Sequence, residues 1–394
     1  MYICLYISIS YASSIINNFS IIGNFKTPKQ IILEQIKHPL NTEFNVKTAQ
    51  EDQQRIYNLD IFSYVQIGYN NSSYVVIVQE KKNVTFKPIL KKTDGIGWTY
   101  GTEVLFNNIN GTANKAGLSI GIGQIELGQI KYIYKSPFNH GEKLSLSYNI
   151  DKNKDIDDEY NITNNITSII YQKKFKHCLL DVGIQNHIHQ LKLNDNKEIN
   201  YSYLSQLLQY LIAKKSKLTS SNIKINFNNF LSSNIYNNYQ TFSFNYQYVY
   251  TLNEKYNAPT INMRTKIYLS SNNTLPLYEK KYIGGDLFVR GYEPKTSLNP
   301  TPVINKLKFN NVIFASLQFE IPWFKKEFYE TRILFFIDQG MGSNQNNSYD
   351  INNRIIGYGF GFQIITKDNT QFDIHVGLNK YHNEIIHFMV KRNV

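Results

Sequence analysis

Cysteine is nearly absent from this sequence, and long apolar runs are missing too. Only Cys4 and Cys178 occur in 394 residues, which excludes a disulfide framework and a cysteine-ligated metal cluster. A phosphate-binding glycine loop is also missing. After the N-terminus no stretch of about 20 apolar residues occurs, so no helical membrane span is expected. These absences do not exclude a β-barrel, because barrel strands cross a membrane with about 10 residues of alternating polarity.

The charge balance is basic but says little about function. Lys and Arg number 42 against 30 Asp and Glu, a formal net charge of +12. A basic surface can attract nucleic acid or anionic lipid. Here the lysines are scattered, and the sequence contains no recognisable nucleic-acid-binding module. The abundance of Asn, Ile, Lys and Tyr is typical of an AT-rich genome, which accounts for part of the positive charge. We therefore expect no nucleic-acid partner.

The first 82 residues predict a leader segment followed by a small α/β domain. Residues 1–18 open with an apolar run ending in small residues, which is typical of a short secretory signal, although a basic start is missing. Residues 19–82 predict the order β-α-α-β-β. The predicted strands cover 19–22, 61–69 and 74–79, and the predicted helices begin at Thr27 and cover 46–59.

Both helices have recognisable features in the sequence. Thr27 is expected to be the N-cap of the first helix, with Pro28 at its first position and Gln30 completing a capping box. The apolar side of the second helix is predicted to hold Val46, Ala49, Ile56 and Leu59.

From residue 86 to the end, apolar and polar residues alternate with period two, which predicts β-strands. Clear strands cover 242–250, 313–321, 356–364, 372–378 and 386–390. Weaker patterns cover 118–134, 143–150, 166–172, 177–193, 199–213, 223–230 and 262–269. The stretch 204–214 fits a helix equally well. Asn- and Lys-rich segments at 151–160 and 344–353 predict loops.

The alternation fits two all-β architectures. A soluble sandwich turns its apolar side inward, whereas a membrane barrel turns that side outward to lipid. The 309 residues of 86–394, divided among about sixteen strands, give roughly 19 residues per strand and connection, which suits a barrel. The predicted fold class is therefore mainly β: a transmembrane antiparallel β-barrel of about sixteen strands at 86–394, preceded by one small α/β domain.

One arginine lies in a glycine-bearing stretch, Gly284 to Tyr292, between two alternating segments. Arginine is rare in this chain, where lysine supplies most of the positive charge. Because lysine cannot make a bidentate bond to a carboxylate, Arg290 indicates a need for the planar guanidinium group. A surface turn with an incidental arginine is the alternative.

Four separated motifs carry a family resemblance. Residues 22–34 and 55–62 are similar to the opening and the second helix end of a POTRA domain, and 284–292 is similar to a signature on a sixth long loop. Residues 335–340, Phe-Phe-Ile-Asp-Gln-Gly, are similar to the strand that faces this loop from inside a barrel. In this order the motifs resemble the outer-membrane protein assembly factor family of BamA and TamA, also called the bacterial surface antigen family. The resemblance covers about residues 19 to 394 and implies a single-POTRA member, with the POTRA domain at 19–82.

Two positions depart from the family pattern. Asp60 stands where the family usually has glycine, and aspartate tolerates the left-handed conformation expected there. The chain ends at Val394 rather than on the aromatic residue common in bacterial barrels, which indicates a weaker insertion signal.

The resemblance implies a site inside the barrel. In the family the sixth loop folds back into the barrel and its arginine meets an acidic residue on the inner wall, so Arg290 is expected to pair with Asp338. Alternation along 332–340 turns Asp338 toward the lumen and Ile337 toward lipid. The expected site residues are Gly284, Gly285, Val289, Arg290, Gly291 and Tyr292 of the loop, with Asp338, Phe336 and Gly340 of the wall. The ion pair would either brace the barrel or take part in handling a substrate.

The implied function is non-enzymatic and uses no metal or cofactor. The protein would assist insertion, assembly or translocation of other outer-membrane proteins. A POTRA edge strand, 61–69 or 74–79, would receive a client strand by β-augmentation. The junction between the first barrel strand, near 98–106, and the last, at 384–394, would open to template insertion.

The expected partners are unfolded outer-membrane protein clients, the lipid bilayer and accessory assembly subunits. The expected location is the bacterial outer membrane with the POTRA domain in the periplasm, and the outer membrane of a mitochondrion or plastid is the alternative. Other functions left open are a dedicated exporter of two-partner type, an organellar import or sorting channel and a passive porin-like channel.

Three further motifs are better explained as structure. Residues 117–121 match the Gly-x-Ser-x-Gly pattern of hydrolases but lie within an alternating strand. His187 and His189 share a strand face without a third metal ligand nearby. The stretch 151–155 resembles a calcium loop without its glycine, so a solvated hairpin loop is expected.

Overall fold

The computed structural model describes residues 15–93, 96–135, 142–155, 160–176, 178–232, 237–254, 258–272, 275–293, 308–344, 354–367, 370–380 and 384–392. Residues 1–14 of the predicted leader (1–18) and residues 345–353 of the predicted loop (344–353) lie outside these ranges. The chain divides into two compact units. The first contains an α/β fold, and the second contains most of a large β-sheet. In the described ranges, no helix is long and apolar enough to cross a bilayer.

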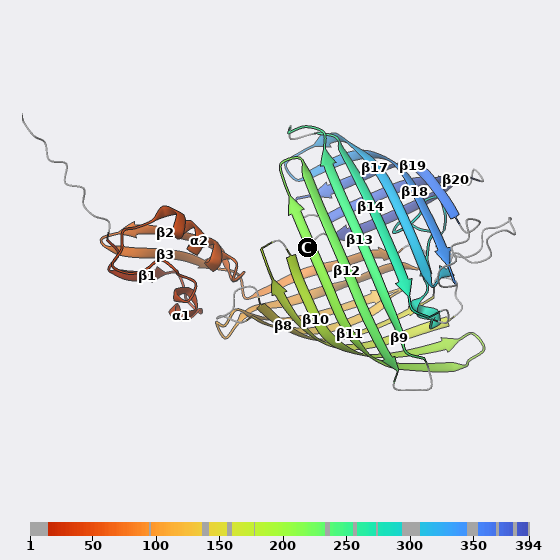
Figure 1. The fold of residues 1–394 in the computed structure, drawn as a ribbon, viewed down its shortest axis with the longest axis horizontal. Coiled ribbons are helices and arrows are strands. Elements are labelled where there is room, and N and C mark those ends of the chain that lie inside the picture. The colour runs from red at the N-terminus through yellow and green to blue at the C-terminus, as the bar shows by residue number, and fades with distance from the viewer. Residues whose placement is uncertain are drawn as a thin grey trace, which may run out of the picture. The chain divides into compact units, whose positions relative to one another are not determined.

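The α/β unit has the predicted element order (Figure 1). Its elements are β1 (Asn18–Ile22), α1 (Lys29–Leu33), α2 (Val46–Tyr57), β2 (Phe62–Asn70) and β3 (Ser73–Glu80). The central strand is β3, which pairs with β1 in parallel and with β2 in antiparallel orientation. The predicted role of 74–79 as an edge strand is therefore wrong, and β1 and β2 are the two edges.

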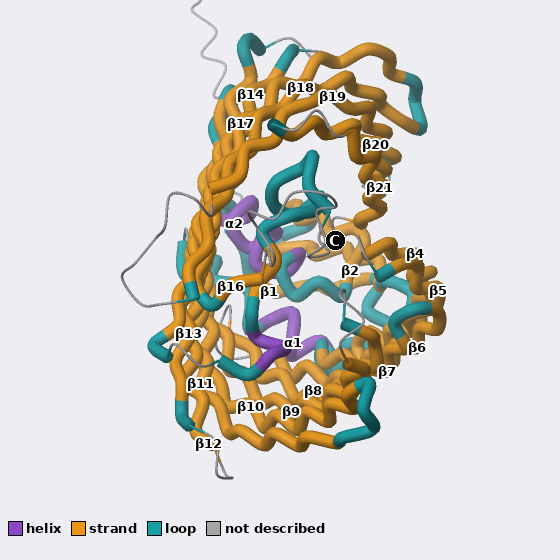
Figure 2. Tube along the Cα trace, turned by 90° about the vertical axis from the view of Figure 1, so that its right-hand side faces the viewer, coloured by secondary structure: helices purple, strands orange, loops and turns teal. Residues whose placement is uncertain are grey.

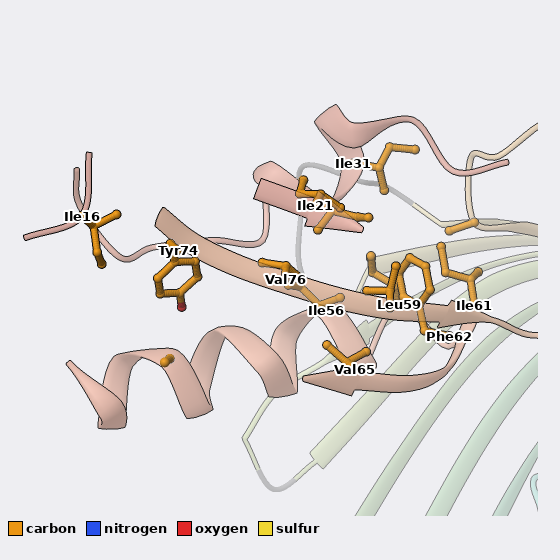
Figure 3. Packing of buried hydrophobic residues seen from close by; sticks show 14 residues of the cluster. Ile16, Ile21, Ile31, Ile56, Leu59, Ile61, Phe62, Val65, Tyr74 and Val76 are labelled. Carbon is orange, nitrogen blue, oxygen red and sulfur yellow. The ribbon is translucent and has the colours of Figure 1, made fainter. Parts of the chain in front are cut away.

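A continuous apolar core joins the sheet to the helices of this unit (Figure 3). Ile56 of α2 and Val76 of β3 are fully buried within it, as are Ile32 and Phe62. Val46, predicted to belong to this core, is 61% exposed. It stands at the first position of α2, where Asn45 caps the helix by accepting the N–H of Thr48.

The predicted capping box of the first helix does not form. The helix begins at Lys29 without a side-chain cap. The hydroxyl of Thr27 instead donates to the Glu80 carboxylate at 2.7 Å and accepts the Asn108 amide at 2.9 Å. The Thr27 hydroxyl, which the local sequence assigns to the start of the helix, is therefore used in tertiary hydrogen bonds with Glu80 and Asn108. Asp60 adopts the left-handed φ of 61° expected at its position.

Asp52 is the buried polar centre of the α/β unit. Its carboxylate accepts the Tyr74 hydroxyl at 2.7 Å and the Lys37 N–H at 2.9 Å, and it forms an ion pair with Arg55. Burial, with a smaller effect of the Asp52 hydrogen bond and charge, raises the pKa of Tyr74 well above its ordinary value. The folded unit therefore favours the protonated phenol.

Removing the Tyr74 hydroxyl should change the stability of this unit in a pH-dependent way. Because the folded-state pKa is raised, the phenol's stabilisation is complete below about pH 10 and declines as the pH rises above that value. We expect Tyr74→Phe to cost about 1.5–3 kcal/mol at pH 8, as for a hydrogen bond to a charged group. We also expect Tyr74→Phe to lose less of its free energy of unfolding between pH 8 and 11 than the wild-type protein does. Pulse proteolysis of the full-length chain in urea measures both, with Tyr57→Phe, at an exposed tyrosine, as the control.

A sheet of sixteen strands makes up the rest of the fold (Figure 1). Consecutive strands are neighbours, and the sheet curves into a ring whose end strands, β4 and β21, come to lie next to each other (Figure 2). The predicted sixteen-stranded barrel is confirmed. Its strands are β4 (Val84–Thr93), β5 (Gly97–Ile109), β6 (Asn114–Gly123), β7 (Glu126–Lys135), β8 (Glu142–Lys154), β9 (Tyr160–Lys174), β10 (Cys178–Leu193), β11 (Glu198–Lys215), β12 (Thr219–Ser232), β13 (Tyr239–Thr251), β14 (Thr260–Ser270), β17 (Asn311–Lys325), β18 (Tyr329–Ser343), β19 (Arg354–Thr366), β20 (Thr370–Asn379) and β21 (Glu384–Arg392).

Three strand predictions need correction. The stretch 118–134 belongs to two strands, β6 and β7, which join at a tight turn. The stretch 204–214 lies in β11 and is not a helix. The first barrel strand is β4, and the predicted 98–106 lies in β5. The lysines and Pro88 weaken the alternation of β4, and proline is tolerated there because β4 is an end strand of the sheet.

Candidate functional site

A long loop, residues 271–310, connects β14 to β17, the eleventh and twelfth strands counted from β4. Its stem contains the 3-10 turn η1 (Leu277–Glu279) and the short paired strands β15 (Lys281–Tyr282) and β16 (Lys308–Phe309). Residues 283–292, which we term the loop tip, fold back on themselves. Gly285, at φ +103°, donates its N–H to the carbonyls of Val289 at 3.2 Å and Tyr292 at 2.9 Å. Arg290 follows Val289 within this compact turn, and the turn directs its side chain toward the barrel wall.

Arg290 forms a bidentate ion pair with Asp338 of β18. Its Nε donates to Asp338 Oδ2 at 2.7 Å and its Nη2 to Oδ1 at 2.9 Å, while its backbone N–H adds a third bond at 3.1 Å. The two side chains are 1% and 0% exposed. A buried pair of this kind is tolerated only when its remaining donors are also occupied.

The inner wall occupies those donors. Arg290 Nη1 donates to Gln318 Oε1 at 2.8 Å, and the guanidinium lies over the Phe336 ring at 3.5 Å from its centroid. Gln318 and Phe336 are register partners on β17 and β18. Asp338 faces inward while Ile337 and Phe335 are each 50% exposed on the outer side. The structure thus places Asp338 on the side that the alternation indicates.

Glycines on the wall allow the loop tip to approach the strands closely. A Cβ at Gly357 of β19 would lie 1.7 Å from the Arg290 carbonyl oxygen, and a Cβ at Gly377 of β20 would lie 2.2 Å from the Gly291 nitrogen. At Gly340 of β18 a Cβ would lie 2.7 Å from a methyl of Val289. Any side chain at 357 or 377 would therefore displace the backbone of the tip.

The last two strands hold the tip by its backbone. The carbonyl of Gly291 accepts the Asn379 amide of β20 at 2.9 Å, and its N–H donates to His387 Nε2 of β21 at 3.3 Å. Gly291 makes both contacts from a left-handed φ of +96°. The tip therefore contacts four consecutive strands, β18 to β21.

Apolar packing completes the tip. Tyr292 and Val289 are fully buried with Ile283, Phe314 and Ile355 in one cluster. All the loop and wall residues that the sequence singles out are brought together, namely Gly284, Gly285, Val289, Arg290, Gly291, Tyr292, Phe336, Asp338 and Gly340. Sequence reasoning missed Gln318, Asn379 and His387. Each is a polar residue at a strand position that faces inward. The alternation of apolar and polar residues along the strand could therefore have identified it.

Known proteins share this architecture. A model of the Omp85 superfamily domain matches residues 209–366, a segment that contains both Arg290 and Asp338. This segment is similar to the Omp85 superfamily domain. The predicted resemblance to the BamA and TamA family is thereby confirmed at the level of the superfamily. No curated protein sequence gives a significant match.

Three solved structures have the same fold at low sequence identity. A crystal structure of BamA from Haemophilus ducreyi lacking POTRA domains 1-3 aligns with a TM-score of 0.73 and 12% identity, covering 95% of this chain and 83% of that one. CdiB from Acinetobacter baumannii aligns at 0.67 and 13% identity, covering 96% and 74%. CdiB from Escherichia coli aligns at 0.66 and 12%, covering 95% and 76%. These similarities establish the fold.

The barrel holds its long loop at a second place. Lys308 of β16 forms an ion pair with Asp155 at 3.0 Å, and both side chains are 6% exposed. The Tyr282 hydroxyl of β15 donates to the same carboxylate at 3.1 Å. The predicted solvated loop at 151–160 is thus wrong in its first part, since β8 continues to Lys154 and Asp155 is buried.

A polar cavity of about 320 Å³ lies beside the loop tip inside the barrel. Arg290 and Gln318 form part of its wall, and His375 and Met389 bring it to the last two strands. Its charged residues are already engaged in part: Glu320 accepts Arg332 at 3.0 Å and Gln318 at 2.9 Å. The remaining lining residues are Gln247, Asn262, Arg264, Gln363, Ile365, Gln371 and Asp373.

The ring has a seam, the junction between β4 and β21. In the described residues the hydrogen-bonded order begins at β21 and ends at β4 without a ladder joining these two strands. A side-chain contact crosses the junction, with Lys92 Nζ of β4 at 4.5 Å from the centroid of the Phe388 ring of β21. Within the described parts of β4 and β21, the two facing edges are therefore not joined by a ladder of backbone hydrogen bonds.

The motifs explained as structure lie within strands. Residues 117–121 are part of β6, without the turn and helix that a hydrolase nucleophile requires. His187 Nε2 bonds Ser205 at 2.8 Å and His189 Nδ1 bonds Asn164 at 2.7 Å, both on the inner face of β10. Within the described ranges, no group of three metal-ligating side chains occurs.

Proposed function

We propose that this protein is a non-enzymatic outer-membrane barrel of the Omp85 superfamily that assists insertion or assembly of other outer-membrane proteins, or their translocation. The observation that carries this proposal is the seam. Two neighbouring strands with unpaired edges offer backbone donors and acceptors to an incoming strand, and this recognition tolerates many sequences. The ring is otherwise continuous through sixteen strands, so the seam is where the sheet can accept another strand with the least loss of hydrogen bonds.

The α/β unit is proposed to be a POTRA domain at 19–82, with the barrel at 86–394. It would face the periplasm and capture unfolded clients by β-augmentation. Of its two edges, β2 offers nine residues and β1 five. We assign capture to β2, because a longer edge provides more backbone hydrogen bonds.

The Arg290–Asp338 pair is proposed to brace the barrel. The Nε, Nη1 and Nη2 atoms of Arg290 all donate to side chains of the wall. Both members of the pair are buried. A brace of this kind needs no chemistry at either group. The remaining partners in this proposal are the lipid bilayer and accessory assembly subunits.

Insertion of a client into liposomes tests the function. A urea-unfolded barrel protein would be diluted into vesicles with or without this protein, and protease protection would be followed over time. We expect several-fold faster protection for at least two unrelated clients, with vesicles that hold a simple porin as the control. Acceleration of a single client would indicate a dedicated exporter, and no acceleration for any client would contradict the proposal.

A further inference from the structure

An apolar groove of about 540 Å³ lies on the barrel wall, across strands β8 to β12. This volume falls within the range of small-ligand pockets, about 300–1,000 Å³. The groove lies on the outer side, because Val182 in its lining is 45% exposed whereas the preceding Asp181, which faces the lumen, is 8% exposed. Apart from Gln206 and the hydroxyl of Tyr171, the lining is apolar. The outer side of a membrane barrel meets lipid, so the groove fits an acyl chain.

A group of lysines lies where the same strands end. The connections from β9 to β10 and from β11 to β12 carry six lysines, which we term the lysine cluster: Lys173, Lys174, Lys176, Lys214, Lys215 and Lys217. Only two of the six have an acidic partner within the described residues. Lys173 lies 3.0 Å from Glu142, and Lys217 lies 3.8 Å from Glu254. The cluster therefore keeps a surplus of positive charge.

Two of the remaining four lysines lie side by side. Cys178 of β10 stands opposite Ile212 of β11, and this register, continued by two positions, brings Lys176 level with Lys214. Like charges directly opposite each other on neighbouring strands are destabilising. Neighbouring strands are about 4.8 Å apart, so one anionic group between the two ammonium groups would relieve the repulsion. Phe175 is exposed in the same turn, and aromatic side chains are typical of the interfacial zone of membrane barrels.

The spacing between the groove and the lysine cluster matches the thickness of one lipid leaflet. Lys214 comes six positions after Leu208, which lines the groove on β11. Six strand residues span about 20 Å, and a strand tilt of about 40° reduces this to about 15 Å of depth. Half of a hydrocarbon core of about 30 Å has the same thickness. A lipid whose headgroup contacts the lysines therefore has chains long enough to reach the groove.

We propose that the groove and the lysine cluster form one binding site for an anionic phospholipid. In this site the phosphate lies between Lys176 and Lys214, and one acyl chain lies in the groove. Because consecutive strands run up and down, the cluster is at the end of the barrel where the chain enters β4, opposite the end from which the long loop leaves. In the proposed orientation this end faces the periplasm. The inference needs the barrel to lie in a bilayer, and it needs no client.

Native mass spectrometry of the full-length protein in detergent tests the site, because it counts the lipid molecules that stay bound. Phosphatidylglycerol would be titrated in parallel with phosphatidylcholine of identical chains. We expect one phosphatidylglycerol molecule to bind roughly 25-fold more tightly, about a factor of five for each of the two lysines. Glycerol phosphate, which has no chains, should not displace it. Equal binding of the two lipids, or displacement by glycerol phosphate, would overturn the proposal.

A double substitution tests the headgroup contacts. Lys176→Gln with Lys214→Gln removes both ammonium groups, so phosphatidylglycerol should bind no more tightly than phosphatidylcholine. Lys326→Gln with Lys367→Gln is the matched control, because it removes the same charge from exposed lysines at the same end of the barrel, on the connections that follow β17 and β19. An equal loss in the control would mean that net charge attracts the lipid without a defined site, which contradicts the proposal.

A single substitution tests the groove. Val182→Trp fills the groove from its lining and leaves the lysines unchanged, so both lipids should bind several-fold more weakly. Ile337→Trp adds the same ring on the outer side of β18, outside the groove, and should leave binding unchanged. Undiminished binding in Val182→Trp would show that the groove does not hold the chain, and the proposal would then be wrong. A protein that fails the insertion assay can still pass these measurements, so the two proposals fail separately.

Discussion

Asp338→Ala and Arg290→Ala should each destabilise the barrel by about 3–5 kcal/mol, the cost of leaving one member of a buried ion pair unpaired. The double variant should be no less stable than either single variant, because the second substitution removes the charge that the first left unpaired. The expected coupling energy is therefore large compared with that of separate sites. Arg290→Ala also removes the contacts of the guanidinium with Gln318 and Phe336. It should therefore be the more damaging of the two single substitutions.

Urea titration of the folded barrel in vesicles measures these values, with the fluorescence of Trp98 and Trp323 as the signal. Arg354→Ala provides the matched control, because Arg354 is exposed and its guanidinium donates to Gln339 Oε1 at the long distance of 3.3 Å. We expect a change within about 0.5 kcal/mol for this surface substitution. Additive losses at 290 and 338 would show that the two residues do not act as a pair.

Gly357→Val should displace the loop tip from the wall while leaving the pair of charges chemically intact. A Cβ at this position would lie 1.7 Å from the Arg290 carbonyl oxygen, which belongs to backbone and cannot rotate away. Overpacking usually costs about 1–3 kcal/mol, and a backbone obstacle places this substitution at the upper end of that range. The valine would push the loop tip away from β19. Because Gly291 moves with the tip, its hydrogen bonds to Asn379 and His387 would be lost.

Trypsin reports this displacement directly, because it cleaves after arginine. In the wild-type barrel Arg290 is 1% exposed, so the bond between Arg290 and Gly291 should resist cleavage. In Gly357→Val we expect cleavage there, identified by the mass of the new fragments. Gly128→Ala is the control: there an added Cβ meets only a methyl of Ile150, at 2.9 Å. Resistance at Arg290 in Gly357→Val would mean that the wall can accommodate a side chain under the tip.

The sequence predicts well those features that depend on alternation within one strand. The inward position of Asp338 follows from its place between Ile337 and Gln339, and neither the seam nor the loop is needed to infer it. The barrel follows similarly from many strands of similar length. Local signals were less reliable where a distant group competes for the same atom, as when the Glu80 carboxylate takes the hydroxyl of Thr27.

The features that the sequence did not reveal depend on pairing between distant segments. The order β1-β3-β2 cannot be read from the chain order, so the edge strand of the α/β unit was ambiguous. β4 was missed because lysines and Pro88 disturb its alternation. Asp155 and His387 have ordinary local sequences, and each acquires its role only when the long loop lies against it.

The two places where the long loop is held have a consequence for the order of folding. Lys308 meets Asp155 across 153 positions of the chain, and Gly291 meets His387 across 96. Contacts of such high order form late, since the intervening chain must lose much of its freedom before they yield any stability. The junction of β4 and β21 joins segments still further apart in the chain, since Lys92 lies over the ring of Phe388, and by the same rule it should form last. We therefore expect the nascent sheet to curl around an interior already filled by its own loop, and to join its first and last strands only in the final step.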